Sequence, residues 1–409
     1  MPSPDVIFIG AGPVGLFAAI QTKLFCPNLK IRMYEKYEEY QRDHVLHVDK
    51  KSYKGSHLNP QFQAILNQLI NTVPTKVIEE KLLTFAKEVG IEIQYQHILS
   101  TQELAEANPE TSVIVGSDGS HSLVRKEVFR DKKIIQEDLQ YIAEIKYTVR
   151  GPSRKMHLQM EFFPILSLIQ HFASEHVGKE HEGQSQVSIR FFIDQTTFEE
   201  MQDLGISFKT PLTLLKAEEI QSPGIKKLIT SIKQWLLARS ELVSEQRIEN
   251  CERITAINLP VYRSELFAQE HGGKTWFLVG DAALGVPYFR ALNAGLLSAT
   301  QLAKSIHSHF YPHPQVVPAF GSYSKMSSVL GKKPKTSIAS YNEHLSSIAA
   351  SEISSARLKS LGVSSALSYA KSSQAVPVSS FLKLTRETRN HIKAIGDNPD
   401  KKQGYCTIL

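Results

Sequence analysis

One segment near the N-terminus constrains the fold more than any other part of the chain. An apolar run at residues 6–9 (VIFI) leads into the glycine-rich sequence GAGPVG at 10–15, an apolar stretch with helical character follows, and residues 31–35 (IRMYE) close the segment with an acid. A strand, a glycine turn, a helix and a second strand in this order make a βαβ unit. The segment therefore predicts an α/β fold with a parallel sheet.

The glycines of this turn predict a dinucleotide site. Gly10 allows the tight turn, Gly12 lets a pyrophosphate approach the backbone, and Gly15 lets the helix pack on the strand. The helix N-terminus that follows offers free N–H groups to phosphate. Glu35 stands about 20 residues further on, where its carboxylate accepts hydrogen bonds from an adenosine ribose.

Composition is that of an ordinary globular protein and narrows the classes of function. The chain has 409 residues, 42% hydrophobic and 22% charged, which suffices for two domains or one large divided domain. The net charge of +6 is spread along the chain without a nucleic-acid motif, so no nucleic-acid partner is expected. Cys26, Cys251 and Cys406 lie far apart, which suits a reducing compartment, and no metal site is expected. The sequence contains no run of about 18 apolar residues, so no membrane span is predicted. The apolar run at 6–9 is too short for a signal peptide.

Two later segments also place an acid after a buried strand. Residues 275–279 (TWFLV) predict a strand, Gly280-Asp281 follows, and a helix opens near Asn293. An Asp at such a strand end hydrogen-bonds a ribityl hydroxyl, and the helix start faces an anionic ring edge or a pyrophosphate. The other segment lies at 113–125 (VIVGSDGSHSLVR).

In this order the three segments resemble the FAD-dependent aromatic hydroxylase class of flavoprotein monooxygenases. Asp118, Gly119, Ser122 and Arg125 match the middle motif of that class, which serves FAD and the pyridine nucleotide, and Asp281 matches the late motif, which contacts the ribityl chain. The resemblance implies a Rossmann-type FAD-binding domain with an inserted β-rich substrate domain, FAD as cofactor and NADPH as electron donor. It covers roughly residues 1–130 and 255–305.

The motifs and the resemblance together predict the residues that bind the cofactor. They are Gly10, Gly12, Pro13, Val14, Gly15, Glu35, Lys36, Arg42, Asp118, Gly280, Asp281, Pro287, Asn293 and Ala294. No catalytic side chain is predicted, because the flavin carries the chemistry: NADPH reduces it, and the reduced flavin activates O₂ to place one oxygen atom on the substrate.

One stretch is similar to a subgroup of the class. Residues 35–48 (EKYEEYQRDHVLHV) look like the equivalent region of MICAL monooxygenases, as do a predicted helix at 74–89 and the sequence GIEI at 90–93. This resemblance places Arg42 along the FAD phosphates. Asp43 stands where that group has Asn, so the role of that Asn is not carried over.

The late loop departs from the class pattern. Leu284 replaces the usual His, and residues 287–293 (PYFRALN) lack two usual glycines, which let backbone approach the flavin ring closely. Arg290 is open to two interpretations: it neutralises charge near the flavin N1 edge, or it forms a structural ion pair. His44 and His47 are interpreted as structural neighbours of the FAD phosphates rather than as catalytic groups.

The middle of the chain is expected to form the substrate layer, and its end a helical extension. Strands are predicted at 141–149, 156–163, 187–193 and 254–262, and helices at 197–204, at 211–237 and around 338–349. Pro312, Pro314 and Pro318 mark a break. A Ser- and Ala-rich stretch at 346–380 is expected to be helical in parts and mobile elsewhere.

The last four residues, Cys406-Thr407-Ile408-Leu409, form a C-a-a-X pattern whose terminal Leu favours geranylgeranylation of the cysteine. A single prenyl chain anchors only marginally, and a basic run-up supplies a second attraction to anionic lipid. That run-up comprises Lys383, Arg386, Arg389, Lys393, Lys401 and Lys402. The alternative is a cysteine that falls at this position by chance.

These interpretations combine into one prediction. The domains are 1–137 and 263–310 (FAD-binding), 138–262 (β-rich, substrate), 311–380 (helical) and 381–409 (basic mobile tail). The function is that of a membrane-anchored NADPH-dependent monooxygenase that oxidises a small aromatic molecule or, as in MICAL proteins, a protein methionine.

The cellular setting and the alternatives follow from the tail and the late loop. Prenylation places the protein on the cytosolic face of a eukaryotic membrane, and otherwise it is cytoplasmic. A prenylated protein of this kind is either a eukaryotic membrane-associated oxidase or a bacterial effector that uses a host prenyltransferase. The effector is the favoured interpretation. The alternative function is a catalytically weak flavin-fold scaffold that binds a host partner. A relative of the flavin halogenases or geranylgeranyl reductases is a third possibility, although no Trp-containing halogenase motif is present.

Overall fold

The computed structural model of the chain describes the residues that follow, and every structural statement below concerns these. They are residues 3–38, 45–130, 135–156, 171, 173–178, 180, 182–207, 209–287, 290–312 and 336–372. The chain divides into two compact units, one made of Met1–Glu137 and Pro260–Ala356 and the other of Asp138–Leu259 and Arg357–Leu409. The strands β7 and β11 and the helix α11 each continue from one unit into the other.

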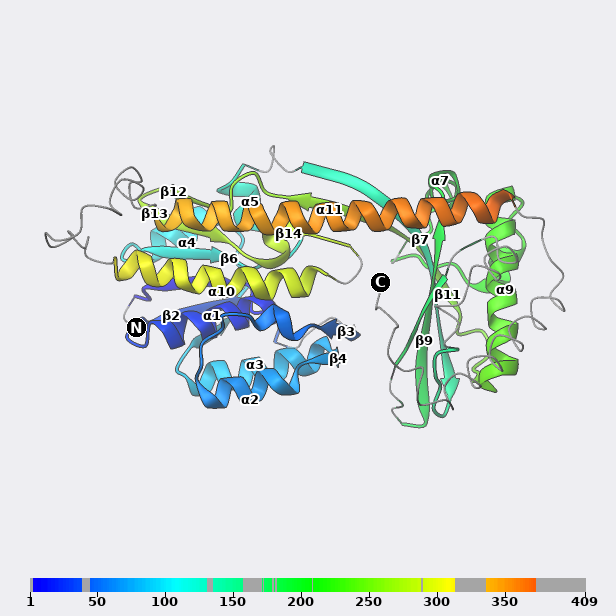
Figure 1. The fold of residues 1–409 in the computed structure, drawn as a ribbon, viewed down its shortest axis with the longest axis horizontal. Coiled ribbons are helices and arrows are strands. Elements are labelled where there is room, and N and C mark those ends of the chain that lie inside the picture. Colours follow the sequence, from blue (N-terminus) through cyan, green and yellow to red (C-terminus); the bar gives the residue numbers. More distant parts are fainter. Residues whose placement is uncertain are drawn as a thin grey trace, which may run out of the picture. The chain divides into compact units, whose positions relative to one another are not determined.

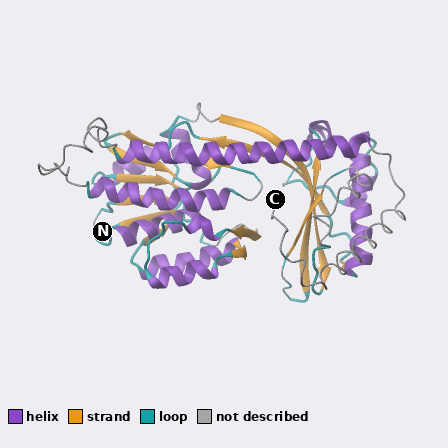
Figure 2. Cartoon of the chain, in the orientation of Figure 1, coloured by secondary structure: helices purple, strands orange, loops and turns teal. Residues whose placement is uncertain are grey.

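The first unit is built on a six-stranded sheet (Figures 1 and 2). Its elements are β1 (Val6–Ile9), α1 (Pro13–Phe25), β2 (Ile31–Glu35), β3 (Val45–Val48), η1 (Lys50–Tyr53), α2 (Pro60–Gln68), β4 (Asn71–Pro74), α3 (Thr75–Glu88), β5 (Glu92–Tyr95), α4 (Thr101–Ala107), β6 (Val113–Gly116), α5 (Leu123–Glu127), β12 (Ala268–His271), β13 (Lys274–Leu278), η3 (Gly280–Ala282), β14 (Leu284–Gly285), α10 (Ala291–Phe310) and α11 (Ser337–Ser372).

The strand order β12-β13-β6-β1-β2-β5 places β1 at the centre of this sheet, and only the β12–β13 pair is antiparallel. All four residues of β1 are buried, as a central parallel strand requires. The helix α1 packs against both α3 and α10 (Figure 1). The predicted strand–turn–helix–strand unit at 6–35 and the predicted strand at 275–279 are present in this sheet, and the segment at 113–125 begins with its strand β6. The predicted helix at 74–89 is α3, which begins one residue later and ends at Glu88.

The helix α11 is a single element of 36 residues, longer than the predicted helix around 338–349. In the first unit it is fixed by polar contacts with the end of the sheet. The Asn342 side chain accepts hydrogen bonds from the N–H groups of Phe267 and Ala268 and donates one to the Ala268 carbonyl. The Tyr341 hydroxyl donates to the Leu278 carbonyl at 2.8 Å. Helix α11 therefore covers the β12–β13 end of the sheet.

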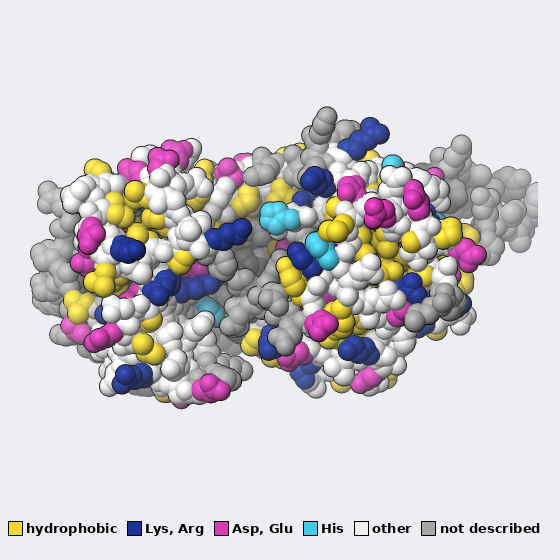
Figure 3. All heavy atoms as spheres, turned by 180° about the vertical axis from the view of Figure 1, so that it is seen from behind, with side chains coloured by type: hydrophobic (Ala, Val, Ile, Leu, Met, Phe, Trp, Pro, Cys, Tyr) yellow, Lys and Arg dark blue, Asp and Glu magenta, His cyan; other side chains and the backbone are white. Residues whose placement is uncertain are grey.

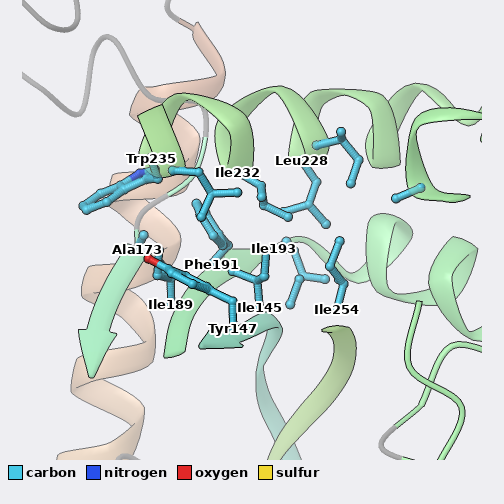
Figure 4. Packing of buried hydrophobic residues seen from close by; sticks show 14 of the residues in the cluster. Ile145, Tyr147, Ala173, Ile189, Phe191, Ile193, Leu228, Ile232, Trp235 and Ile254 are labelled. Atoms are coloured by element: carbon cyan, nitrogen blue, oxygen red, sulfur yellow. The ribbon is translucent and has the colours of Figure 1, made fainter. Parts of the chain in front are cut away.

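The second unit is antiparallel. Its elements are β7 (Ile135–Arg150), β8 (Ala173–Val177), β9 (Gln184–Ile193), α7 (Gln195–Asp203), α8 (Leu214–Glu218), α9 (Pro223–Val243), β10 (Gln246–Arg247) and β11 (Arg253–Arg263). The strands follow the order β14-β11-β7-β9-β8, and β10 pairs with β7. Alternate residues of β7 and β9 point into a core with α9. Figure 4 shows Leu228, Ile232 and Trp235 of that helix directed at Ile145, Phe191 and Ile193.

The predicted helix at 211–237 is wrong in its first half. The structure has a short α8 and then a separate α9, and Leu212 lies in a β-bridge with Ile254. The break has a local cause, because the Ser222 hydroxyl caps α9 by accepting from Ile225 N–H and Pro223 occupies the first turn. Strand β8 was not predicted, and the predicted strand at 156–163 lies outside the described residues apart from its first residue.

Candidate cofactor site

The turn after β1 owes its shape to two glycines that touch the rest of the protein. Gly10 has φ +100°, and a Cβ atom there would lie 2.5 Å from the Ser117 carbonyl oxygen. A Cβ atom at Gly15 would lie 2.4 Å from the Gly10 carbonyl oxygen. Both distances are far inside van der Waals contact, so these two positions require glycine for folding alone.

Gly12 differs from both, because apart from its chain neighbours no atom of the described residues lies within 4 Å of the position that its Cβ would take. Gly12 is the N-cap of α1, at φ −68° and ψ 174°, and no side chain caps the helix. Pro13 follows in the first turn, where a missing N–H costs nothing. The first turn of α1 thus faces open space beside Gly12, as an anion-binding helix start requires.

Glu35 is joined directly to this turn. Its Oε2 accepts a hydrogen bond from the Ala11 N–H at 2.7 Å, and its Oε1 accepts one from the Tyr37 N–H at 3.1 Å. Each carboxylate oxygen has a second lone pair for a further donor. The neighbouring Lys36 places its ammonium 5.0 Å from the Tyr37 ring centroid, a cation–π contact.

The middle motif lies in the loop after β6. The Asp118 Oδ2 accepts from the Leu123 N–H at 2.6 Å, whereas its Oδ1 is buried and has no hydrogen-bond partner among the described residues. Burial raises the pKa of the Asp118 carboxyl, although the hydrogen bonds from Ser122 and Leu123 oppose that shift. Gly119 adopts φ +83° beside it.

Arg125 connects the middle motif to the late one. Its buried guanidinium donates to the carbonyls of Ala282 at 2.9 Å, Asp281 at 3.3 Å and Ser120. The Tyr262 hydroxyl also donates to the Asp281 carbonyl, at 2.8 Å, and its ring centroid lies 5.2 Å from the Arg125 guanidinium. Arg125 therefore holds the backbone of the late motif in place.

The late motif packs directly on the glycine turn. Gly280 adopts φ +63°, and a Cβ atom there would lie 3.0 Å from Val14. A Cβ atom at Gly295, in α10, would lie 2.7 Å from the same Val14 side chain. The start of α1, the half-buried Asp281 and the buried Ala294 therefore meet at one place, although they are far apart in the sequence.

The start of α10 is tied to its surroundings by Asn293 and Arg290. The Asn293 Oδ1 accepts from the Asp49 N–H at 3.0 Å and the Ser52 hydroxyl at 2.7 Å. Arg290 makes a bidentate ion pair with Glu352 of α11, with Nη2 to Oε1 at 2.6 Å. Glu352 raises the pKa of Arg290, as it would for a structural pair. Of the two interpretations of Arg290, this contact favours the structural one.

Leu284 lines a small apolar pocket with neighbours from three elements. The lining residues are Gly280, Ala283, Leu284, Ala294, Gly295, Ser298, Leu345 and Ile348. Leu345 and Ile348 come from α11, so this helix contributes to the pocket that Leu284 lines. Pro287 is buried just beyond. Tyr288 and Phe289 lie outside the described residues.

Several predicted residues are not among those that the structure describes. Arg42, His44 and Cys406 are among these, and for His47 in β3 only the backbone is described. Sequence reasoning missed Ser117 and Tyr262, which contact the predicted residues Gly10 and Asp281. Ser117 could have been found, since it directly follows a predicted strand end, and its hydroxyl donates to the Ile9 and Gly10 carbonyls.

Charges are mixed across the face shown in Figure 3, with acidic and basic side chains interspersed. Across the described ranges, no group of three or more His, Cys, Asp and Glu side chains is arranged to hold a metal ion. No described helix has the length and apolar character that crossing a bilayer requires.

Comparison with known proteins identifies the fold through structure. No protein-family model and no curated protein matches the sequence. The solved structures that are similar include CabE, an aromatic hydroxylase from angucycline biosynthesis (13% identity, 100% of this chain, 79% of that chain, TM-score 0.52). They also include CmlS, a flavin-dependent halogenase (11% identity, 97% of this chain, 71% of that chain, TM-score 0.51). A third is the tetracycline destructase Tet(51) (12% identity, 96% of this chain, 99% of that chain, TM-score 0.52). The chain shares the fold of these solved structures, a Rossmann-like parallel sheet with an inserted antiparallel β-domain, as predicted.

Proposed function

We propose that this chain is an FAD-dependent monooxygenase that uses NADPH to place one atom of O₂ on a small aromatic molecule or a protein side chain. One observation carries the proposal: of the glycines of the turn, Gly12 is the one whose Cβ position stays open among the described residues, at a helix start without a side-chain cap, and the Ala11 N–H beside it donates to Glu35. An aromatic hydroxylase and a flavin-dependent halogenase share the fold.

The residues around this turn fit an FAD molecule. Gly12 with the first turn of α1 would hold the pyrophosphate, and Glu35 the adenosine ribose. Asp281 would serve the ribityl chain, and Asp118 lies in the adjoining loop after β6, where its Oδ2 accepts from the Leu123 N–H. Bound FAD would accept a hydride from NADPH and activate O₂. The protein binds and orients the cofactor, and Arg125 fixes the late motif that would face it.

The first test is the visible spectrum of the purified protein, followed by NADPH oxidation. We expect a flavin absorption band, FAD released on denaturation, and NADPH consumption above that of a buffer containing the same FAD. A colourless protein that does not take up added FAD would contradict the proposal at its first step.

The altered late loop favours a second candidate, a catalytically weak flavin-fold scaffold that binds a partner. Arg290 is engaged by Glu352, Asn293 by Asp49 and Ser52, and Leu284 by an apolar pocket, so these three described side chains of the loop are committed to protein contacts. Bound FAD without any stimulation of NADPH oxidation would support the scaffold over the enzyme.

The expected membrane anchor is a separate proposal that rests on sequence. Where Leu409 is the terminal residue, we propose that Cys406 is geranylgeranylated and holds the protein at the cytosolic face of a eukaryotic membrane. Cys406→Ser is expected to move a fluorescent fusion from membranes to the cytosol, because the basic residues alone bind too weakly. The control is Cys251→Ser, which leaves the motif intact. Membrane association unchanged in Cys406→Ser would refute prenylation as the anchor.

A further inference from the structure

The small apolar pocket at Leu284 lies between the late loop and two helices. The helix α10 and the first half of α11 run side by side in the first unit (Figure 1), and both contribute to the wall of the pocket. Gly280 and Gly295 also line it, and both pack on Val14 in the first turn of α1. The pocket is therefore one layer of residues away from the glycine turn at 10–15.

Most of the pocket wall is buried. Of the eight residues that line the pocket, seven are buried, and Ile348 of α11 alone is half-buried. Ile348 thus stands on the side from which a molecule can enter. The pocket leaves about 10 Å³ for the centre of a water-sized sphere, which is the room that one small molecule needs.

The wall offers a water molecule few hydrogen-bond partners. Among the lining residues, all of which the structure describes, Ser298 carries the only polar side chain, and its Oγ donates to the Gly295 carbonyl at 2.8 Å. The Gly280 carbonyl accepts from the Ala283 N–H, and the Ala283 carbonyl accepts from the Ser264 N–H, each at 2.9 Å. A buried water needs about two to four polar partners, whereas a dry apolar cavity binds apolar molecules such as xenon. The pocket therefore suits a small apolar molecule.

We propose that this pocket is a binding site for dioxygen and supplies O₂ to FAD bound at the neighbouring turn. This inference rests on the proposed function, which requires O₂ to reach a cofactor in the first unit. O₂ is a small apolar molecule, so it favours a dry apolar cavity over water, as xenon does. Gly280 and Ala294 line the pocket and are also among the residues predicted to bind FAD. The pocket thus shares part of its wall with the proposed cofactor site.

The first test exposes the apoprotein to xenon. Methyl resonances of isotope-labelled leucine and isoleucine are recorded under xenon and under the same pressure of helium. The methyl groups of Leu284 and Leu345 should shift with xenon, because both side chains line the pocket. Those of Leu58 and Leu99, which are exposed in the first unit, should not. Ile348→Phe fills the mouth of the pocket and should weaken xenon binding about tenfold or more, because the cavity is lost.

The second test follows reoxidation of the reduced holoenzyme at increasing O₂ concentrations by stopped-flow absorbance. This reaction transfers two electrons and two protons from reduced FAD to O₂ and yields oxidised FAD and H₂O₂. Ile348→Phe is expected to lower its rate constant by about tenfold, because O₂ and xenon need the same space. Ile348→Ala widens the mouth and should lower neither xenon binding nor the rate. The matched control is Leu358→Phe, the same kind of change at an exposed position of the same helix, which should behave as wild type.

The outcomes separate the pocket from the proposed function. Methyl groups of Leu284 and Leu345 that ignore xenon, or that respond equally in Ile348→Phe, would overturn the O₂ site and leave the FAD site standing. A reoxidation rate unchanged in Ile348→Phe, although xenon binding is lost, would reduce the pocket to a packing void. A protein that takes up xenon but no FAD would overturn the proposed function and the assignment to O₂ with it. Circular dichroism melts of the variants would show that each is folded.

Discussion

Replacing Arg239 with Met is expected to lower the free energy of unfolding of the second unit by about 3–5 kcal/mol, the typical cost of leaving a buried charge without its partner. Arg239 has no exposed surface, and it donates to Glu175 at 2.8 Å and to Glu245 at 2.8 Å. Its Nε also donates to the Tyr147 hydroxyl at 2.8 Å. The variant would leave two buried carboxylates facing each other without a cation.

The two tryptophans make this change measurable in one unit at a time. Trp235 lies one helical turn before Arg239 in the second unit, and Trp276 lies in the first. Urea unfolding followed by fluorescence in a Trp276→Phe background reports the second unit alone. The matched control is Lys233→Met in the same helix, whose ion pair with Glu218 is exposed and is worth about 0–1 kcal/mol.

A second comparison tests the cause. Changing Arg239, Glu175 and Glu245 together to apolar residues removes every charge of the network, and such replacements are often neutral or stabilising. The triple variant is therefore expected to be more stable than Arg239→Met alone. If Arg239→Met unfolds at the same urea concentration as Lys233→Met, the buried network does not stabilise this unit.

The parts of the fold that sequence predicted are those with a local signal. The turn at 10–15, the acid at the end of β2 and the strand before Asp281 each stand within a short stretch in which residue type and spacing determine the backbone. The same reasoning failed at 211–237, where helical periodicity continues across Ser222-Pro223 although those residues begin a new helix. A capping residue followed by proline carried more information there than the apolar pattern.

Other parts depend on contacts between distant residues, and no local pattern reports them. Asn342 is an ordinary polar residue in the sequence of α11, and only the fold brings its side chain to the backbone of Phe267 and Ala268. Arg239 likewise looks like a solvated residue of an amphipathic helix, until Glu175 in β8 and Glu245 after α9 are placed around it. The interpretation of Arg290 stayed open for the same reason, because its partner Glu352 is 62 residues away.

Changing Gly12 to Asp is expected to abolish FAD binding while leaving the apoprotein as stable as wild type, or more so. Among the described residues beyond its chain neighbours, no atom lies within 4 Å of the new Cβ position, and the backbone angles of Gly12 suit any residue. Asp is also a favoured N-cap, and its charge favours a helix start. The same carboxylate would face the pyrophosphate, and like charges in contact cost several kcal/mol, so the Kd for FAD should rise about 100-fold or more.

Two matched variants separate charge from packing in this experiment. Gly12→Ser adds a neutral N-cap of similar size, so it should weaken FAD binding less than Gly12→Asp and keep the wild-type melting temperature. Gly15→Ala places a methyl group 2.4 Å from the Gly10 carbonyl oxygen and should lower the melting temperature without any ligand. The measurements are fluorescence titration with FAD and thermal melts of the apoproteins. If Gly12→Asp binds FAD as tightly as wild type, the pyrophosphate does not lie at this turn, because the new carboxylate would repel a pyrophosphate bound there and weaken FAD binding.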